Sequence, residues 1–226
     1  MKVETLESCP NGNDMWWQHE ITGEVRPWRC RKLTCVFCAP IEAVLVGKAI
    51  RMAKPTSAVM LTQVGERWPD TRHKVNKITK SIRRSFGHDA WSMAYHVERD
   101  PGSPGCHIHG WHRGTTVPKD DLQVHASRAG IGIVDIQRVR YGSFSYGMTQ
   151  VIEAPENADL DGAQQQIDDF LDINGHRLVH TTRGYWVDKN GQTITQRKAK
   201  SLVGGFGEDP YWRRVRFGAP VAMVRT

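Results

Sequence analysis

Apolar and polar residues alternate along two neighbouring stretches in the middle of the chain. Residues 91–98 place Trp91, Met93, Tyr95 and Val97 on one face of an extended strand, and Ser92, Ala94, His96 and Glu98 on the other. The run DPGSPG follows, and its glycines and prolines are typical of a turn. Residues 106–112 alternate again after this turn. The pattern therefore predicts an antiparallel hairpin formed by 91–98 and 106–112.

The remaining patterns predict helices and strands on both sides of this hairpin. Helices are expected at 41–53, 70–86, 118–130 and 163–172, strands at 57–63 and 131–140, and a second hairpin at 177–194 around the Asn190-Gly191 turn. Strands that pair as antiparallel neighbours, with helices between the others, indicate the α+β class. We therefore expect a central antiparallel sheet with packed helices.

The hairpin carries a candidate metal site. His107 and His109 share one face of their strand. If Glu98 lies opposite His107, the register places His96 opposite His109. A carboxylate beside imidazoles favours Mg or Mn, although zinc also accepts these ligands. His112 breaks the alternation and is expected to point away. A solvated polar face is the alternative interpretation.

The charge of the chain favours a polyanionic partner. The formal net charge is +7 and the pI is about 9.3, which makes nucleic acid the commonest class of partner. The candidate DNA-binding residues are Lys74, Lys77, Lys80, Arg83, Arg84, Arg138 and Arg140. Those within 70–86 could equally form an ordinary solvated helix face. The C-terminal runs QRKAK and YWRRVR are also basic, and the second interleaves aromatic residues in a way that suits single strands.

Four cysteines near the start of the chain predict a structural zinc site. Cys30, Cys35 and Cys38 follow the spacing Cys-x4-Cys-x2-Cys, and Cys9 or His19 could complete the ligand set. A disulfide or unrelated buried thiols are the alternatives. No signal-peptide pattern and no apolar stretch of bilayer length is found, so we expect a cytoplasmic protein, in which disulfides are disfavoured.

Three short motifs, in order, resemble the HUH endonuclease superfamily, specifically the rolling-circle replication initiators of plasmids and single-stranded DNA viruses. VMLTQ, 59–63, resembles the first family motif. HIH, 107–109, matches the His-hydrophobic-His motif, and Glu98 stands where many members place a third metal ligand. SYGMTQ, 145–150, occupies the place of the tyrosine motif. The resemblance spans roughly residues 30–150.

The tyrosine motif departs from the family pattern, which usually places a Lys three or four residues after the tyrosine. Here Gln150 stands four residues after Tyr146. Gln150 can position a water or a phosphate oxygen but carries no charge, so the metal or an arginine such as Arg138 or Arg140 would have to provide it. Tyr146 is the preferred nucleophile and Tyr141 the alternative.

The resemblance implies a site-specific nicking and joining enzyme. It would cut single-stranded DNA at a replication origin through a 5′-phosphotyrosine intermediate, in the cytoplasm of a prokaryotic host, with a host helicase or polymerase as a candidate partner. The implied organisation is a zinc module at 1–40, an endonuclease core at 41–153 and a C-terminal extension at 154–226. Residues 151–174 are acidic and contain no Lys or Arg, which predicts an acidic linker and helix before the basic hairpin and tail.

Two other functions fit the same residues. The run HIHGWH approaches the His-x-His-x-Asp-His signature of metallo-β-lactamase-type hydrolases, but Trp111 replaces the Asp that would bind metal and activate water. A non-enzymatic zinc-dependent nucleic-acid-binding protein would explain the cysteines and the charge. It would leave the histidine group unused.

Overall fold

The chain forms an α+β structure, which confirms the fold class expected from the sequence. The computed structural model describes residues 9, 15–23, 25–27, 30–64, 68–99, 105–139, 160–204 and 212–216. Within these residues the helices are α1 (Ala39–Met52), α2 (Trp68–Phe86), α3 (Lys119–Arg128), α5 (Leu160–Ile173) and α6 (Gln196–Gly204). The strands are β1 (Met15–His19), β2 (Val25–Pro27), β3 (Ser57–Val64), β4 (Ser92–Arg99), β5 (Gly105–Arg113), β6 (Ile133–Arg138), β7 (His180–Thr181) and β8 (Trp212–Arg216).

A five-stranded sheet forms the centre of the molecule, in the order β6-β3-β5-β4-β7. Every neighbouring pair is antiparallel. β4 and β5 form the expected hairpin, and their register places Glu98 opposite His107 and His96 opposite His109. The alternation of the sequence therefore predicted the pairing and the faces, because a shift of one residue would turn every apolar side chain of β4 to the other face. The register that the sequence analysis took as a condition, Glu98 opposite His107, is the one observed.

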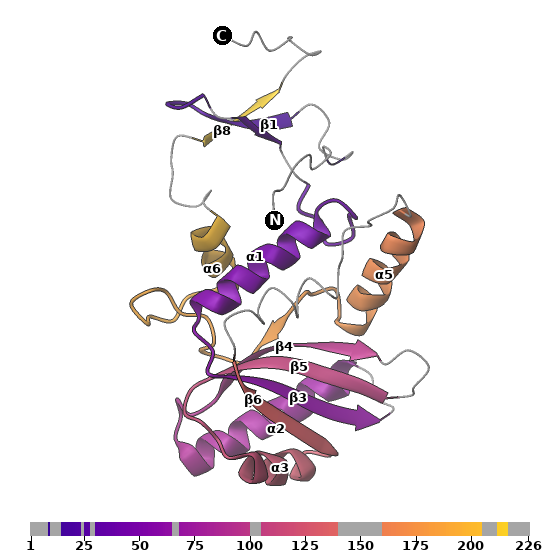
Figure 1. Cartoon of the computed structure of the whole chain (residues 1–226), viewed down its shortest axis with the longest axis vertical. Coiled ribbons are helices and arrows are strands. Elements are labelled where there is room, and N and C mark those ends of the chain that lie inside the picture. Colours follow the sequence, from indigo (N-terminus) through magenta and orange to yellow (C-terminus); the bar gives the residue numbers. More distant parts are fainter. Residues whose placement is uncertain are drawn as a thin grey trace.

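Helices cover both faces of the sheet (Figure 1). On one face, α2 and α3 pack Val75, Ile78 and Leu122 against strand residues such as Ile108. On the other face, a second core joins residues of α1 and α5 to the segment around Tyr185. The sequence of α2 repeats apolar residues at helical spacing, at Val75, Ile78, Ile82 and Phe86. The first three are buried in the structure, whereas Phe86 is 41% exposed.

The predicted second hairpin is much shorter than expected. β7 contributes two residues, which pair with Tyr95 and Ala94 of β4. A single bridge between Val187 and Thr193 closes the turn at 190–191. The alternation expected of a strand fails here because consecutive residues 185–187 are all buried in the core instead of alternating between faces.

The two ends of the described chain meet in a small sheet with the order β2-β1-β8. The basic run predicted as a tail forms β8, which pairs antiparallel with β1. Residues expected in a C-terminal extension also belong to the core, since Ile167 and Phe170 of α5 share one hydrophobic cluster with α1 residues such as Val46.

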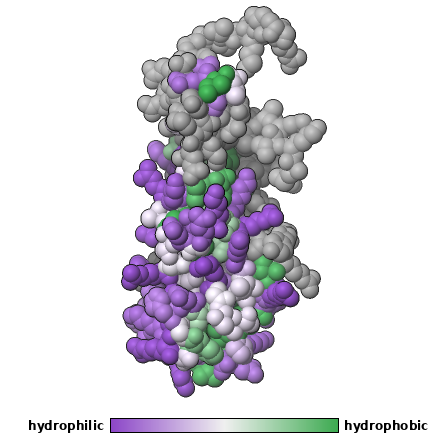
Figure 2. Space-filling model, turned by 90° about the vertical axis from the view of Figure 1, so that its left-hand side faces the viewer, coloured by the Kyte–Doolittle hydropathy of each residue, from purple (hydrophilic) through white to green (hydrophobic). Residues whose placement is uncertain are grey.

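The described surface is largely polar on the side shown in Figure 2, where hydrophilic residues predominate and hydrophobic residues form smaller patches. Among the described residues, no helix combines the length and hydrophobicity that crossing a bilayer would require.

Candidate metal centres and their surroundings

The four cysteines gather into one compact group at the start of α1. Their Sγ atoms all lie within 4.8 Å of one another. The Cys9 and Cys35 sulfurs are 3.5 Å apart, as are those of Cys30 and Cys38. Four thiolates at about 2.3 Å from a tetrahedral zinc ion would lie about 3.8 Å apart. The cluster could therefore hold a metal ion, and its spacing is consistent with structural zinc.

Backbone hydrogen bonds form the turn that carries Cys35 and Cys38. The amide N–H groups of Cys38 and Ala39 both donate to the carbonyl of Cys35, which closes a tight turn before α1. Arg31 adopts a left-handed conformation with φ of 54° next to Cys30. Cys9 stands 26 residues before Cys35 in the sequence and completes the group. Its side chain is buried, and its sulfur lies 3.5 Å from that of Cys35.

Burial and hydrogen bonds shift the pKa values of the thiols in opposite directions. Burial raises the pKa of Cys9, but hydrogen bonds from the Cys30 backbone and from the neighbouring thiols outweigh this effect and lower the pKa to about 7. Burial raises the pKa of Cys38. His19, the alternative ligand, accepts the Thr22 backbone N–H at Nδ1 over 3.0 Å. The described geometry therefore gives the fourth position to Cys9.

The histidine group lies on two adjacent strands of the main sheet. His96 and Glu98 stand on β4, and His107 and His109 on β5. This is the sheet face that α5 covers, since the rings of His96 and Phe170 lie 5.8 Å apart. His109 and Glu98 keep side-chain exposures of 37% and 35%, so both remain accessible to solvent.

Glu98 connects the histidines. One carboxylate oxygen lies 2.7 Å from Nε2 of His96, and the other lies 3.2 Å from Nε2 of His109. Burial alone would raise the pKa of Glu98, but the hydrogen bond from His96 and the neighbouring imidazoles outweigh it, so the pKa lies below its usual value. Glu98 is therefore held as a carboxylate.

His96 orients this carboxylate from within the core. Its side chain is completely buried, packed against the rings of Trp111 and Phe170. Its Nδ1 has no hydrogen-bond partner. Because a buried N–H without a partner costs more than an unused lone pair, Nε2 carries the proton and donates it to Glu98. This geometry favours an orienting role for His96 over the role of metal ligand that the sequence suggested.

Glu98 and His109 have the spacing of neighbouring ligands. Two ligand atoms at about 2.1 Å from one cation, at right angles, would lie about 3.0 Å apart. The observed 3.2 Å between the Glu98 oxygen and His109 Nε2 is close to this value. The ring centroid of His107 lies 6.1 Å from that of His109. Within the described part of the chain, however, only the cysteine group brings three or more ligand atoms within 4.8 Å of one another.

Thr62 on β3 fixes the orientation of His107. Its Oγ1 lies 2.9 Å from His107 Nδ1, and the two residues face each other across the β3–β5 pair. This contact leaves Nε2 as the nitrogen that would bind a cation. Thr62 was not among the predicted site residues, although it belongs to the VMLTQ motif, and that motif was the signal that could have identified it.

His112 lies on the other face of β5 and points away from the histidine group, as the sequence predicted. It is fully buried and stacks on Trp91 with ring centroids 4.0 Å apart. Its Nε2 lies 3.1 Å from the Ala90 carbonyl, and its Nδ1 lies 3.2 Å from Thr56 Oγ1. Burial lowers the pKa of His112 to about 4. His112 is therefore a structural residue that packs the core.

The basic residues of α2 lie across the sheet from the histidine group, because α2 packs on the opposite face (Figure 1). Lys74 donates to the Gly130 carbonyl, and Arg83 donates to the carbonyls of Trp91 and Arg183. Lys74 and Arg83 therefore connect α2 to neighbouring segments of the chain through hydrogen bonds. The predicted DNA-binding residues Lys77, Lys80, Arg84 and Arg138 are exposed, and Arg140 lies outside the described residues.

The predicted tyrosine motif also lies outside the described residues, which end at 139 and resume at 160. This applies to Tyr141, Tyr146 and Gln150. Both described tyrosines, Tyr95 and Tyr185, are buried, and burial raises the pKa of each phenol.

Comparison with known proteins gives no further assignment. No protein-family model, no curated protein and no solved structure matches this chain significantly.

Proposed function

We propose that this protein is a metal-dependent endonuclease of single-stranded DNA that cuts and rejoins strands through a tyrosine, as its resemblance to rolling-circle initiators implies. The observation that carries the proposal is the contact of Glu98 with His109 on paired central strands, at the spacing of two cation ligands. His107 stands opposite Glu98 in the same register.

Each residue of the histidine group has a separate role in this proposal. Glu98, His107 and His109 hold a divalent cation, Mg or Mn, while His96 and Thr62 orient Glu98 and His107. The cation, when bound, neutralises a phosphate oxygen and orients the scissile group. The phenol oxygen attacks phosphorus, the bond to the 3′ oxygen breaks, and that oxygen leaves as a hydroxyl after taking up a proton. The 5′ phosphate stays on the tyrosine, so that a 3′-hydroxyl can reverse the step.

The sheet register bears on which tyrosine can reach the cation. Arg138, the last residue of β6, shares a row with Ser57, whereas His109 shares a row with Met60. Arg138 and His109 are therefore three residues apart along the strand direction and two strand spacings apart across the sheet. Together these offsets separate the two residues by about 14 Å. Tyr146 follows Arg138 by eight residues and can cover this distance even if the chain is helical, at about 12 Å plus its side chain. Tyr141 follows by three and would need a fully extended chain. The spacing supports Tyr146.

Burial narrows the set of candidate nucleophiles to Tyr141, Tyr146 and Tyr211. The chain has five tyrosines, and burial removes Tyr95 and Tyr185 from contact with DNA. A phenol with a raised pKa inside the core is also a poor nucleophile, because the phenolate is disfavoured there.

The proposal can be tested by metal-dependent cleavage of labelled single-stranded DNA. His109→Ala and Glu98→Gln should each lower cleavage by at least about 100-fold, because a bound cation contributes several kcal/mol to the reaction. His88→Ala, at an exposed histidine on the turn before β4, is the matched control and should cut normally. Unchanged cleavage by His109→Ala and Glu98→Gln would refute the proposed metal centre.

A second function is favoured by the cysteine group, which is the most compact set of ligands in the described structure. With zinc bound there, the protein could bind nucleic acid without cutting it. This alternative predicts salt-sensitive binding, loss of binding on removal of the metal from the cysteines, and no cleavage under any metal. Tight binding by wild-type protein without any cleavage in Mg or Mn would favour it over the endonuclease.

A further inference from the structure

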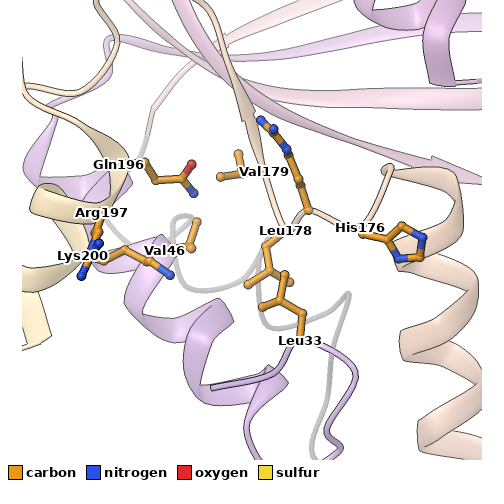
Figure 3. A pocket seen from close by; sticks show the side chains of 9 residues that line it. Leu33, Val46, His176, Leu178, Val179, Gln196, Arg197 and Lys200 are labelled. Carbon is orange, nitrogen blue, oxygen red and sulfur yellow. The ribbon is translucent and has the colours of Figure 1, made fainter. Parts of the chain in front are cut away.

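A pocket of about 290 Å³ opens between α1, α6 and the chain that follows α5. None of the residues assigned above lines it. Its lining residues are Leu33, Val46, His176, Arg177, Leu178, Val179, Gln196, Arg197 and Lys200. Figure 3 shows Arg197 and Lys200 on the α6 side, His176 on the opposite side, and Val46, Leu178 and Leu33 between them. The volume is close to the lower limit of about 300 Å³ for small-ligand sites.

The pocket combines an apolar floor with a cationic rim. Leucine and valine side chains form the floor, and no Asp or Glu belongs to the lining. Lys200 is neutralised in part by Glu42, whose Oε2 accepts its ammonium at 2.6 Å. Arg177 and Arg197, which are exposed, therefore provide most of the positive charge at the rim. This combination suits a ligand that has both a flat apolar part and an anionic part.

The backbone at the pocket edge is strained. His176 adopts a left-handed conformation with φ of 59°, directly after Gly175 with φ of 56°. Its N–H donates to the Leu171 carbonyl over 2.7 Å, which fixes the end of α5. A non-glycine residue in this region costs about 1 kcal/mol or more and is often kept at ligand sites. Glycine would satisfy the same turn, so the turn alone does not explain the imidazole at this edge.

The same segment joins the pocket to the histidine group. The side chain of Asn174 donates to the Val97 carbonyl and accepts the Val97 N–H, both at 2.8 Å. Val97 lies between His96 and Glu98 on β4. Val46, Leu178 and Val179 of the pocket belong to the core that contains Trp111, whose ring packs on His96, so the pocket lies on the sheet face of the candidate cation site. Asn174 adds a buried, fully hydrogen-bonded link to β4.

We propose that this pocket binds one nucleotide of the single-stranded DNA, with its base on the apolar floor and the phosphates on its 5′ and 3′ sides at Arg177 and Arg197. The inference rests on the proposed function for the identity of the strand. A DNA single strand supplies both parts of the ligand, because every nucleotide carries a planar base beside a charged phosphate. A peptide of Asp and Glu alone would offer the charge but no apolar group for the floor.

The test is the affinity of the full-length protein for a short oligo-dT, measured by fluorescence anisotropy without added Mg or Mn. The double variant Arg177→Gln/Arg197→Gln should weaken binding by roughly tenfold or more. The slope of log K against the logarithm of the salt concentration should also become less steep by about 1.4, because each lost phosphate contact removes about 0.7. Lys189→Gln, at an exposed lysine in the turn between Val187 and Thr193, is the control for lost charge and should bind normally.

Two further probes test the apolar floor. The wild-type protein should bind oligo-dT more tightly than an abasic strand of equal length, and the double variant should lose most of its affinity for both. Polyglutamate of equal charge should compete poorly. Unchanged affinity in the double variant, or equal competition by polyglutamate, would overturn the pocket assignment. Binding without cleavage would leave this assignment standing and refute only the endonuclease, so the two failures are distinguishable.

Discussion

A single hydroxyl decides how His107 presents its ring. Thr62 Oγ1 contacts Nδ1 at 2.9 Å, which leaves Nε2 as the nitrogen that could bind a cation. Threonine is common in buried strands for its β-branched shape alone, and only the tertiary pairing of β3 with β5 shows that this one contacts an imidazole. Sequence patterns located the histidines and Glu98, but they could not show that His96 is buried and orients Glu98.

Thr62→Val should therefore weaken Mn binding at the histidine group by about 10- to 100-fold, because loss of the partner that orients a ligand histidine has effects of this size. Isothermal titration calorimetry with Mn measures the change. Thr56→Val is the matched control, since Thr56 makes the equivalent contact with His112 on the other face. An equal loss of affinity in both variants would show that the effect is structural.

The buried His112 predicts a pH dependence of stability. Burial lowers its pKa from 6.5 to about 4, so between these values the unfolded chain binds a proton that the folded chain does not. Stability is therefore complete above pH 6.5 and falls as the pH drops toward 4, by about 3 kcal/mol for this residue. Urea unfolding at several pH values measures how the free energy of unfolding changes with pH. Between pH 4 and 6.5 this change should be smaller for His112→Gln than for wild type. His88→Gln should keep the wild-type slope, and an unchanged slope in His112→Gln would argue against the burial effect.

The strands and helices follow from the sequence wherever their hydrophobic period is clear. The apolar alternation of 91–98 predicted β4 and its buried face, and the helical spacing of Val75, Ile78 and Ile82 predicted the buried face of α2. The chain after α5 was harder to predict, because Tyr185, Trp186 and Val187 are buried in succession and no strand period survives. The pairing of β8 with β1 joins residues nearly two hundred positions apart, which no local pattern can predict.

The end of β5 depends on a glycine. Gly114 has φ of +139°, and a Cβ there would overlap the backbone carbonyl of Ala90. Gly114→Ala should lower the free energy of unfolding by about 1–3 kcal/mol more than Gly87→Ala, because overpacking against backbone cannot be relieved by a side-chain rotation. Gly87 also has a positive φ, of +103°, but has nothing within 4 Å of the added methyl. Chemical denaturation of Gly114→Ala and Gly87→Ala separates the effect of the clash from that of the backbone strain. Equal losses in the free energy of unfolding would mean that the turn at Gly114 shifts to relieve the clash.

The whole molecule places two candidate metal centres in different parts of the fold. The cysteine group sits before α1, whose residues pack in the same core as those of α5. The histidine group lies on the central sheet. We expect the first to stabilise the fold and the second to act on DNA, because four thiolates form a closed site whereas Glu98 and His109 remain accessible.

Purified protein should therefore contain about one zinc ion per chain, and Cys38→Ser should lose that zinc together with thermal stability. Metal analysis by mass spectrometry and a thermal melt measure the two effects. Cys106→Ser is the control, because Cys106 is buried in the other core, away from the cluster, and should keep the zinc. Four freely reactive thiols in zinc-free, fully folded protein would rule out the structural site.

The proposed chemistry leaves a bond that can be located. Wild-type protein incubated with circular single-stranded DNA and Mn, then denatured and digested, should give one peptide from 141–150 that carries DNA on Tyr146. Tyr146→Phe should give no adduct while it still binds DNA, and Tyr141→Phe should give the wild-type adduct. DNA that is cut and released with no peptide attached, or an adduct that forms equally well without a divalent cation, would contradict the mechanism.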